Sequence, residues 1–173
     1  MKKLTLTLFV FFVLGNLVAQ KEANEKPKIY RPEADAKADI KSALEKANKE
    51  GKHVLLQAGG NWCSWCLRFN QKVTTNDTLK TALEKNYVIY HLNYSKENKN
   101  DEIMTSLGYP QRFGFPVFIV LDAKGNRLHT QSSGYLESGK GYSTELVLDF
   151  FNQWSPSALD PKTYEKKEEA KKN

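Results

Sequence analysis

Two cysteines three residues apart, which follow directly on an apolar segment, constrain the fold of this chain more than any other feature. Residues 53–58 (HVLLQA) form a short apolar run that is typical of a buried strand, and residues 59–61 (GGN) interrupt it. Cys63 and Cys66 then open a predicted helix that runs to about Lys72. The sequence therefore predicts a buried strand that leads directly into a helix at the first cysteine.

Apolar periodicity and turn signals place the other elements around this unit. Helices are predicted over residues 33–50, 76–84 and 102–107 and from Ser143 or Thr144 onward, and strands over 87–93, 116–122 and 127–132. The order is β-α-β, then a β-hairpin, then a closing helix. It predicts an α/β domain over residues 33–157, with a mixed sheet of four to five strands and helices on both faces.

The cysteine pair indicates thiol chemistry and not a structural bridge. The chain has only two cysteines, and a disulfide between Cys63 and Cys66 would close a loop too short to add much stability. A cysteine in the first turn of a helix lies near unpaired backbone N–H groups and the positive end of the helix dipole, which stabilise its thiolate. Cys63 is therefore the predicted nucleophile. Cys66, one turn further along the same face, would form the disulfide with it.

Metal and haem sites are disfavoured by the residues around the pair. A zinc site of this kind would need a second cysteine pair, and a c-type haem site would need histidine after Cys66, where the chain has Leu67. His53, His91 and His129 lie in predicted strands without ligand spacing. The sequence predicts no cofactor and no metal.

The N-terminus is typical of a secretory signal. Lys2 and Lys3 precede an uncharged apolar stretch that ends in the acceptable cleavage site Leu17-Val18-Ala19, so residues 1–19 are the predicted signal peptide. An uncleaved membrane anchor is the alternative, although the stretch is shorter than the ~20 residues that span a bilayer. We expect a periplasmic or secreted protein with no stable membrane insertion after signal removal.

Composition supplies expectations for the remaining segments and for partners. Residues 20–32 are polar with two prolines and are predicted to be a linker, and the Lys/Glu-rich residues 158–173 are predicted to be a disordered tail. The formal net charge is +6, but the basic residues are spread along the chain and are not interleaved with aromatics on one element. Nucleic-acid binding is not expected.

Two segments of the chain resemble the thioredoxin superfamily. Residues 61–66 (NWCSWC) resemble its active-site segment, and Gly114-Phe115-Pro116 before a strand resembles the turn that faces the cysteines. The resemblance covers about residues 35–155 and is nearest to exported thioredoxin-like and disulfide-isomerase-like proteins. It implies a thioredoxin-like fold, a cis peptide bond at Pro116, and a substrate chain that pairs with the backbone of Phe115. By the same resemblance, Trp62 lies on the active-site surface.

The chain departs from the thioredoxin pattern at positions that assist the second cysteine. Thioredoxins carry a buried acid six positions before the nucleophile, where this chain has Gln57, which cannot take up a proton. A lysine often accompanies that acid on the next strand, and His91 occupies the corresponding place. Our hypothesis is that His91 serves as the base if it faces the site. Trp65, between the cysteines, either selects substrates or packs against a neighbouring loop.

Together these features predict an enzyme, an exported thiol–disulfide oxidoreductase that acts on cysteine-containing exported proteins. The motif shows no added acid or base, which favours a reductase supplied with electrons by a membrane thiol reductant. A disulfide isomerase or oxidase is the alternative within the same chemistry. A thioredoxin-fold module that binds proteins without catalysis is the alternative outside it.

Overall fold

The computed structural model describes residues 28–165 of the chain. The predicted signal peptide, residues 1–19, lies outside the described residues, as do the start of the predicted linker and the end of the predicted tail. Within residues 28–165, no helix has the length and apolar character needed to cross a membrane.

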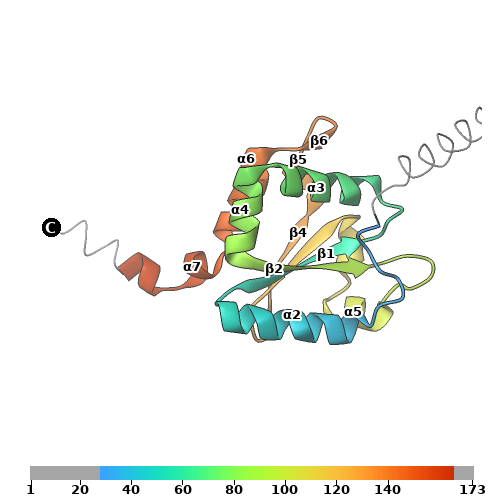
Figure 1. The fold of residues 1–173 in the computed structure, drawn as a ribbon, viewed down its shortest axis with the longest axis horizontal. Coiled ribbons are helices and arrows are strands. Elements are labelled where there is room, and N and C mark those ends of the chain that lie inside the picture. The colour runs from blue at the N-terminus through green and yellow to red at the C-terminus, as the bar shows by residue number, and fades with distance from the viewer. Residues whose placement is uncertain (1–27, 166–173) are drawn as a thin grey trace, which may run out of the picture.

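A mixed four-stranded sheet forms the centre of the molecule (Figure 1). Its order is β2-β1-β3-β4, with β1 parallel to β2 and antiparallel to β3, and β3 antiparallel to β4. The strands are β1 (His53–Gly59), β2 (Tyr87–Asn93), β3 (Val117–Leu121) and β4 (Arg127–Ser132). The four predicted strands are confirmed, because each was expected within one residue of these bounds.

Helices cover both faces of this sheet, as predicted (Figure 1). On one face, Leu56 and Ala58 of β1 pack with Ala43 of α2 and Met104 of α5. On the other face, Leu55 packs with side chains of α3, α4 and α6. The helices are α2 (Ala36–Glu50), α3 (Ser64–Thr75), α4 (Asp77–Asn86), α5 (Asp101–Ser106) and α6 (Thr144–Gln153). Side chains alternate along β1, so Gln57 faces the α3 side.

Several short elements of the structure had no counterpart in the sequence prediction. They are η1 (Pro110–Phe113), η2 (Ser133–Leu136) and the two-stranded hairpin of β5 (Glu137–Ser138) and β6 (Gly141–Tyr142). Each is too short for a helical or alternating pattern to be recognised. The hairpin matters for the site, because Tyr142 Oη donates to the carbonyl of Trp65 at 3.3 Å.

The predicted linker is wrong over its last residues. Tyr30 is only 2% exposed. Its backbone N–H donates to Asn61 Oδ1 at 3.1 Å, and its carbonyl accepts from Asn61 Nδ2 at 2.8 Å. The polar residues around it suggested solvent exposure, but burying one large aromatic ring is enough to fix the backbone beside it.

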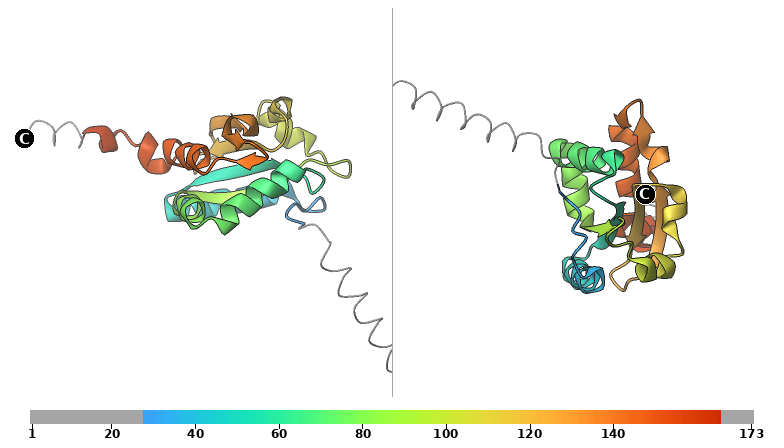
Figure 2. Two further views of the ribbon diagram at one scale, coloured as in Figure 1. Left: turned by 90° about the horizontal axis from the view of Figure 1, so that it is seen from above. Right: turned by 90° about the vertical axis from the view of Figure 1, so that its right-hand side faces the viewer.

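The prediction of a disordered tail is also wrong for residues 158–165. Ser155 accepts the backbone N–H of Ala158 at 3.2 Å and caps α7 (Pro156–Leu159), which has proline at its first position. Residues 162–165 are helical as well, and Tyr164 Oη donates to the carbonyl of Ala158 at 2.7 Å. Composition missed these turns because they are held by local caps and not by a core. Figure 2 shows α7 leading away from the sheet.

Candidate active site

Cys63 lies at the N-cap of α3, directly after β1 and a short turn. Its sulfur accepts the backbone N–H of Cys66 at 3.1 Å, a bond of the kind that Ser or Asp makes at this position. The two cysteines form a disulfide with a Cα–Cα distance of 5.2 Å. The predicted start of a helix at the first cysteine is confirmed.

The two sulfurs differ in their access to solvent. Cys63 is 5% exposed and Cys66 is fully buried. An incoming disulfide can therefore approach Cys63 more readily than Cys66. When Cys63 is reduced, the Cys66 N–H and the positive end of the α3 dipole lie where they stabilise its thiolate.

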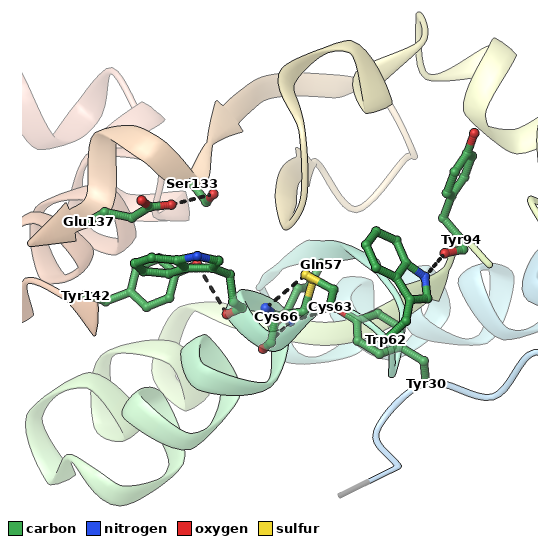
Figure 3. The surroundings of a disulfide bond; sticks show 10 residues. Tyr30, Gln57, Trp62, Cys63, Cys66, Tyr94, Ser133, Glu137 and Tyr142 are labelled. Carbon is green, nitrogen blue, oxygen red and sulfur yellow. Dashed lines mark hydrogen bonds between the residues drawn. A yellow bond between two sulfur atoms is a disulfide. The ribbon is translucent and has the colours of Figure 1, made fainter. Parts of the chain in front are cut away.

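A partly exposed group of aromatic side chains adjoins Cys63 on one side, and Figure 3 shows two of its members, Trp62 and Tyr94. Trp62 is 58% exposed, and its indole Nε1 donates to the Tyr94 carbonyl at 2.8 Å. Phe115 meets Trp62 edge-on at 5.5 Å between ring centroids and stacks on Tyr94 at 4.9 Å. We call Trp62, Phe115 and Tyr94 the aromatic ledge. A hollow of about 570 Å³ adjoins it, lined by Trp62, Tyr94, Ser95, Lys96, Glu97 and Lys99.

Phe115 also packs against the cluster of Tyr30, Cys63 and Cys66. The peptide bond that joins Phe115 to Pro116 is cis, and Pro116 is buried at the start of β3. This contact brings the turn before β3 to the cysteines, although Phe115 lies 49 positions after Cys66 in the sequence.

Trp65 points to the opposite side of the disulfide from the ledge. Its ring meets Tyr142 of β6 edge-on at 5.5 Å, and the Arg68 guanidinium lies 4.8 Å from its centroid. Figure 3 shows Tyr142 and Trp62 on opposite sides of the cysteines. Of the two roles considered for Trp65, packing against a neighbouring segment is the one that the contacts favour.

Buried polar groups surround Cys66 on the side away from solvent. Gln57 is fully buried, and its Nε2 donates to the Cys66 carbonyl at 3.1 Å and to Tyr30 Oη at 2.7 Å. Gln57 Oε1 is buried without a hydrogen-bond partner in the described part of the chain. A Cβ added to Gly59 would lie 2.4 Å from Cys66 Sγ and 2.9 Å from Tyr30 Oη, so the backbone approaches both groups closely.

His91 lies next to this cluster, as the partner of Gln57 in the register of β1 and β2, and its ring contacts Tyr30. Their rings meet edge-on at 5.4 Å, and His91 Nε2 is buried with no hydrogen-bond partner among residues 28–165. Burial lowers the pKa of His91 to about 4. At neutral pH this imidazole is uncharged and a weak proton acceptor, which argues against His91 as the base.

The structure thus brings together most of the residues selected from the sequence and adds others. Cys63, Cys66, Trp62 and Phe115 lie side by side, whereas Trp65 faces β6. The main additions are Tyr30, Asn61 and Tyr94. Tyr30 offered a signal in the sequence as a large aromatic beside Ile29 in an otherwise polar segment, and Asn61 as the first residue of the segment that resembles the thioredoxin active site.

Comparisons with known proteins agree with this geometry. The profile of a family described as thioredoxin-like matches residues 35–123. The crystal structure of a disulphide isomerase from Xylella fastidiosa Temecula1 is similar, with 26% identity, a TM-score of 0.65, and coverage of 75% of this chain and 98% of that one. The C-terminal domain of Neisseria meningitidis DsbD in its reduced form matches in fold, with 18% identity, a TM-score of 0.50, and coverage of 68% and 96%. No curated protein sequence matches significantly.

A mixed sheet covered by helices, together with a disulfide of Cys-x-x-Cys spacing at the start of a helix, defines a thiol–disulfide oxidoreductase. The chain belongs to the thioredoxin-like family, whose profile covers half of its length. The predicted fold and enzyme class are both confirmed.

The close approach at Gly59 predicts a steric effect of a single methyl group. In Gly59→Ala, the added Cβ would collide with Cys66 Sγ, which the disulfide holds in place, and with Tyr30 Oη. We expect the oxidised protein to lose about 1–3 kcal/mol of unfolding free energy, the usual cost of overpacking, in urea denaturation. Gly141→Ala is the control, since no atom lies within 4 Å of its Cβ position. Equal effects of the two substitutions would contradict the close packing at Gly59.

The low pKa of His91 predicts a pH dependence of stability. Unfolding exposes the imidazole and returns its pKa to about 6.5. Between about pH 6.5 and pH 4, the unfolded chain therefore binds a proton that the folded chain does not, and stability falls as the pH falls. Above about pH 6.5, His91 is neutral in both states and does not change the unfolding free energy with pH. In the unchanged protein, the low pKa of His91 lowers the unfolding free energy by up to about 3 kcal/mol between pH 6.5 and pH 4, and His91→Phe is expected to abolish this effect. Urea denaturation at a series of pH values measures the difference. Parallel profiles of the two proteins would contradict the burial of a neutral His91.

Proposed function

We propose that this protein reduces disulfides in cysteine-containing exported proteins through the Cys63–Cys66 pair. The observation that carries the proposal is the position of Cys63 at the start of α3, where its sulfur accepts the Cys66 N–H and keeps some access to solvent. A sulfur in this position is a stabilised thiolate when reduced and an accessible nucleophile.

The reaction proceeds in two exchanges between sulfur atoms. The Cys63 thiolate attacks one sulfur of a substrate disulfide, forms a mixed disulfide and releases the other substrate sulfur as a thiolate, which takes a proton from water. Cys66 loses its proton and attacks Cys63 Sγ, which breaks the bond to the substrate and forms the Cys63–Cys66 disulfide. The substrate gains two electrons and the enzyme loses them.

The substrate is held beside Cys63 by the surface that surrounds it. Trp62 and Phe115 supply apolar area at low entropic cost, since their rings are already fixed by Tyr94. An extended substrate segment lies along the turn before β3 and forms hydrogen bonds with the backbone of Phe115, next to the buried Pro116. Trp65 packs against Tyr142 of β6 on the other side of the disulfide and is not the main contact with the substrate.

Two features of the setting complete the proposal. The protein acts in the periplasm or outside the cell, because residues 1–19 have the pattern of a secretory signal. Each turnover leaves the pair oxidised, so a membrane thiol reductant is needed to restore it.

A disulfide isomerase is the second candidate, and one observation favours it. The similar structure from Xylella fastidiosa, 26% identical to this chain, is a disulphide isomerase. An isomerase uses the same first step, but the substrate's own cysteine resolves the mixed disulfide. The reduction potential against glutathione distinguishes the candidates, since a reductase is expected near −270 mV and an isomerase near −180 mV.

Substitution of each cysteine tests the assigned roles. The mature protein is expected to reduce insulin disulfides in the presence of a thiol reductant, and Cys63→Ser is expected to fall to the background rate, since it lacks the accessible sulfur. Cys66→Ser keeps the nucleophile but cannot resolve the intermediate, so it is expected to accumulate a mixed disulfide visible on a non-reducing gel.

Each of the two variants is the control for the other, because both lose one thiol at the same motif. If Cys63→Ser and the unchanged protein reduced insulin at the same rate, the reduction would not depend on Cys63. That result would contradict the proposed enzyme and favour the non-catalytic binding module. If mixed disulfides accumulated on Cys66 in Cys63→Ser instead, the two roles would be reversed.

A further inference from the structure

The second exchange step poses a problem for this chain that the proposed function leaves unsolved. Cys66 must become a thiolate while it is fully buried, and burial among apolar groups disfavours the charged form. Gln57 occupies the place of the thioredoxin acid but cannot take up or release a proton. A different group must stabilise the Cys66 anion.

Tyr30 is the polar group best placed to do so. It packs in one cluster with Cys63 and Cys66. Its hydroxyl oxygen and Cys66 Sγ approach the same point, since a Cβ on Gly59 would lie within 2.9 Å of the first and 2.4 Å of the second. Figure 3 shows Tyr30 beside the cysteine pair.

The hydrogen bonds of Gln57 leave the hydroxyl hydrogen of Tyr30 available. The Cys66 carbonyl can only accept a hydrogen bond, so the Gln57 atom that faces it at 3.1 Å must be the nitrogen. The same nitrogen lies 2.7 Å from Tyr30 Oη and donates to it. Tyr30 therefore accepts from Gln57, and this bond does not use the hydroxyl hydrogen of Tyr30 itself.

We propose that Tyr30 donates its hydroxyl hydrogen to Cys66 Sγ when this sulfur becomes a thiolate, and so promotes the second exchange. The inference rests on the proposed function, because only that reaction requires a Cys66 anion. The Cys66 proton leaves to water, the anion attacks Cys63 Sγ, and the substrate thiolate departs. Tyr30 keeps its proton throughout and only stabilises the charge.

The surrounding titratable groups offer no better donor or base. His91 on β2 contacts Tyr30 and is neutral, and Tyr142 on β6 contacts the backbone of Trp65. Arg68 on α3 stacks on Trp65 at the exposed surface. No Asp, Glu, Lys or Arg side chain is buried within residues 28–165. A neutral hydrogen-bond donor is therefore the available means of stabilisation, and burial raises the pKa of Tyr30, which keeps it protonated.

The position of Tyr30 assigns a role to the segment before the family domain. Tyr30 precedes residues 35–123, which match the family profile. Both backbone groups of Tyr30 are bonded to the Asn61 side chain, in the turn that leads to Cys63. This pair of bonds fixes the N-terminal segment against the site.

Titration of Cys66 alone tests the role of Tyr30 without any substrate. In a Cys63→Ser background Cys66 is the single cysteine, and NMR of ¹³C-labelled cysteine follows its ionisation. Adding Tyr30→Phe keeps the ring and removes the donor. We expect the pKa of Cys66 to rise by about one unit, or about tenfold less thiolate at a given pH, the usual effect of a hydrogen bond to a charged group.

Tyr87→Phe is the matched control, because Tyr87 is also buried and donates to the Phe151 carbonyl at 2.8 Å on the same face of the sheet. It is expected to leave the Cys66 titration unchanged. An unchanged or lowered pKa in Tyr30→Phe would overturn the proposal, as would equal shifts in both variants.

A second variant covers the case that Tyr30→Phe fails to fold. Asn61→Ala removes both bonds that hold the Tyr30 backbone and is expected to raise the pKa of Cys66 in the same direction. An unchanged value would again overturn the proposal. The titration and the insulin assay test different claims. If the protein were inactive in the insulin assay, the titration of Cys66 would still report on Tyr30. If the protein were active but the pKa of Cys66 did not change in Tyr30→Phe, only the role of Tyr30 would be contradicted.

Discussion

Cys63 caps α3 with its own sulfur, which accepts the backbone N–H of Cys66 at 3.1 Å. This hydrogen bond caps the start of the helix and places a backbone donor at the outer sulfur, while the disulfide sets the spacing of the two sulfurs. Strand β1, buried from Val54 to Gly59, leads to this point from the centre of the sheet, so the reactive pair follows directly on the core of the fold. A cap that is also a nucleophile couples helix stability to the redox state of the protein.

The surroundings of the pair differ on its two sides, and the difference matches two separate tasks. The outer sulfur adjoins the aromatic ledge and the hollow beside it, which together offer apolar area to a partner. The inner sulfur lies among buried polar groups that are uncharged, and no Asp, Glu, Lys or Arg is buried within residues 28–165. Thioredoxins use a buried acid here, and this chain uses an amide and a phenol. The substitution avoids burying a carboxylate, whose desolvation is costly.

The regular strands and helices of the fold were predicted well from the sequence. Residues 87–93 and 127–132 were expected as strands and form β2 and β4 within those bounds, because alternation and apolar runs report burial directly. The short hairpin of β5 and β6 and the ordered Tyr30 were not predicted. Neither belongs to a stretch with apolar periodicity. Tyr142 of the hairpin packs on α3 through contacts between distant segments, and Tyr30 is a single aromatic ring in a polar segment. Trp65 was left open for the same reason, since its partner Tyr142 lies 77 residues away.

The chain by itself determined the reactive pair, the strand that leads to it and the helix that begins there, since these depend on local order along the backbone and on a spacing of three residues. Only the tertiary structure decided which side chains surround each sulfur. Tyr30, Gln57 and Phe115 come from three distant segments, and their meeting at Cys66 and Cys63 follows from how the sheet and helices pack. Local propensity fixes elements within a few residues, whereas contacts between distant segments form only when their apolar surfaces are buried together.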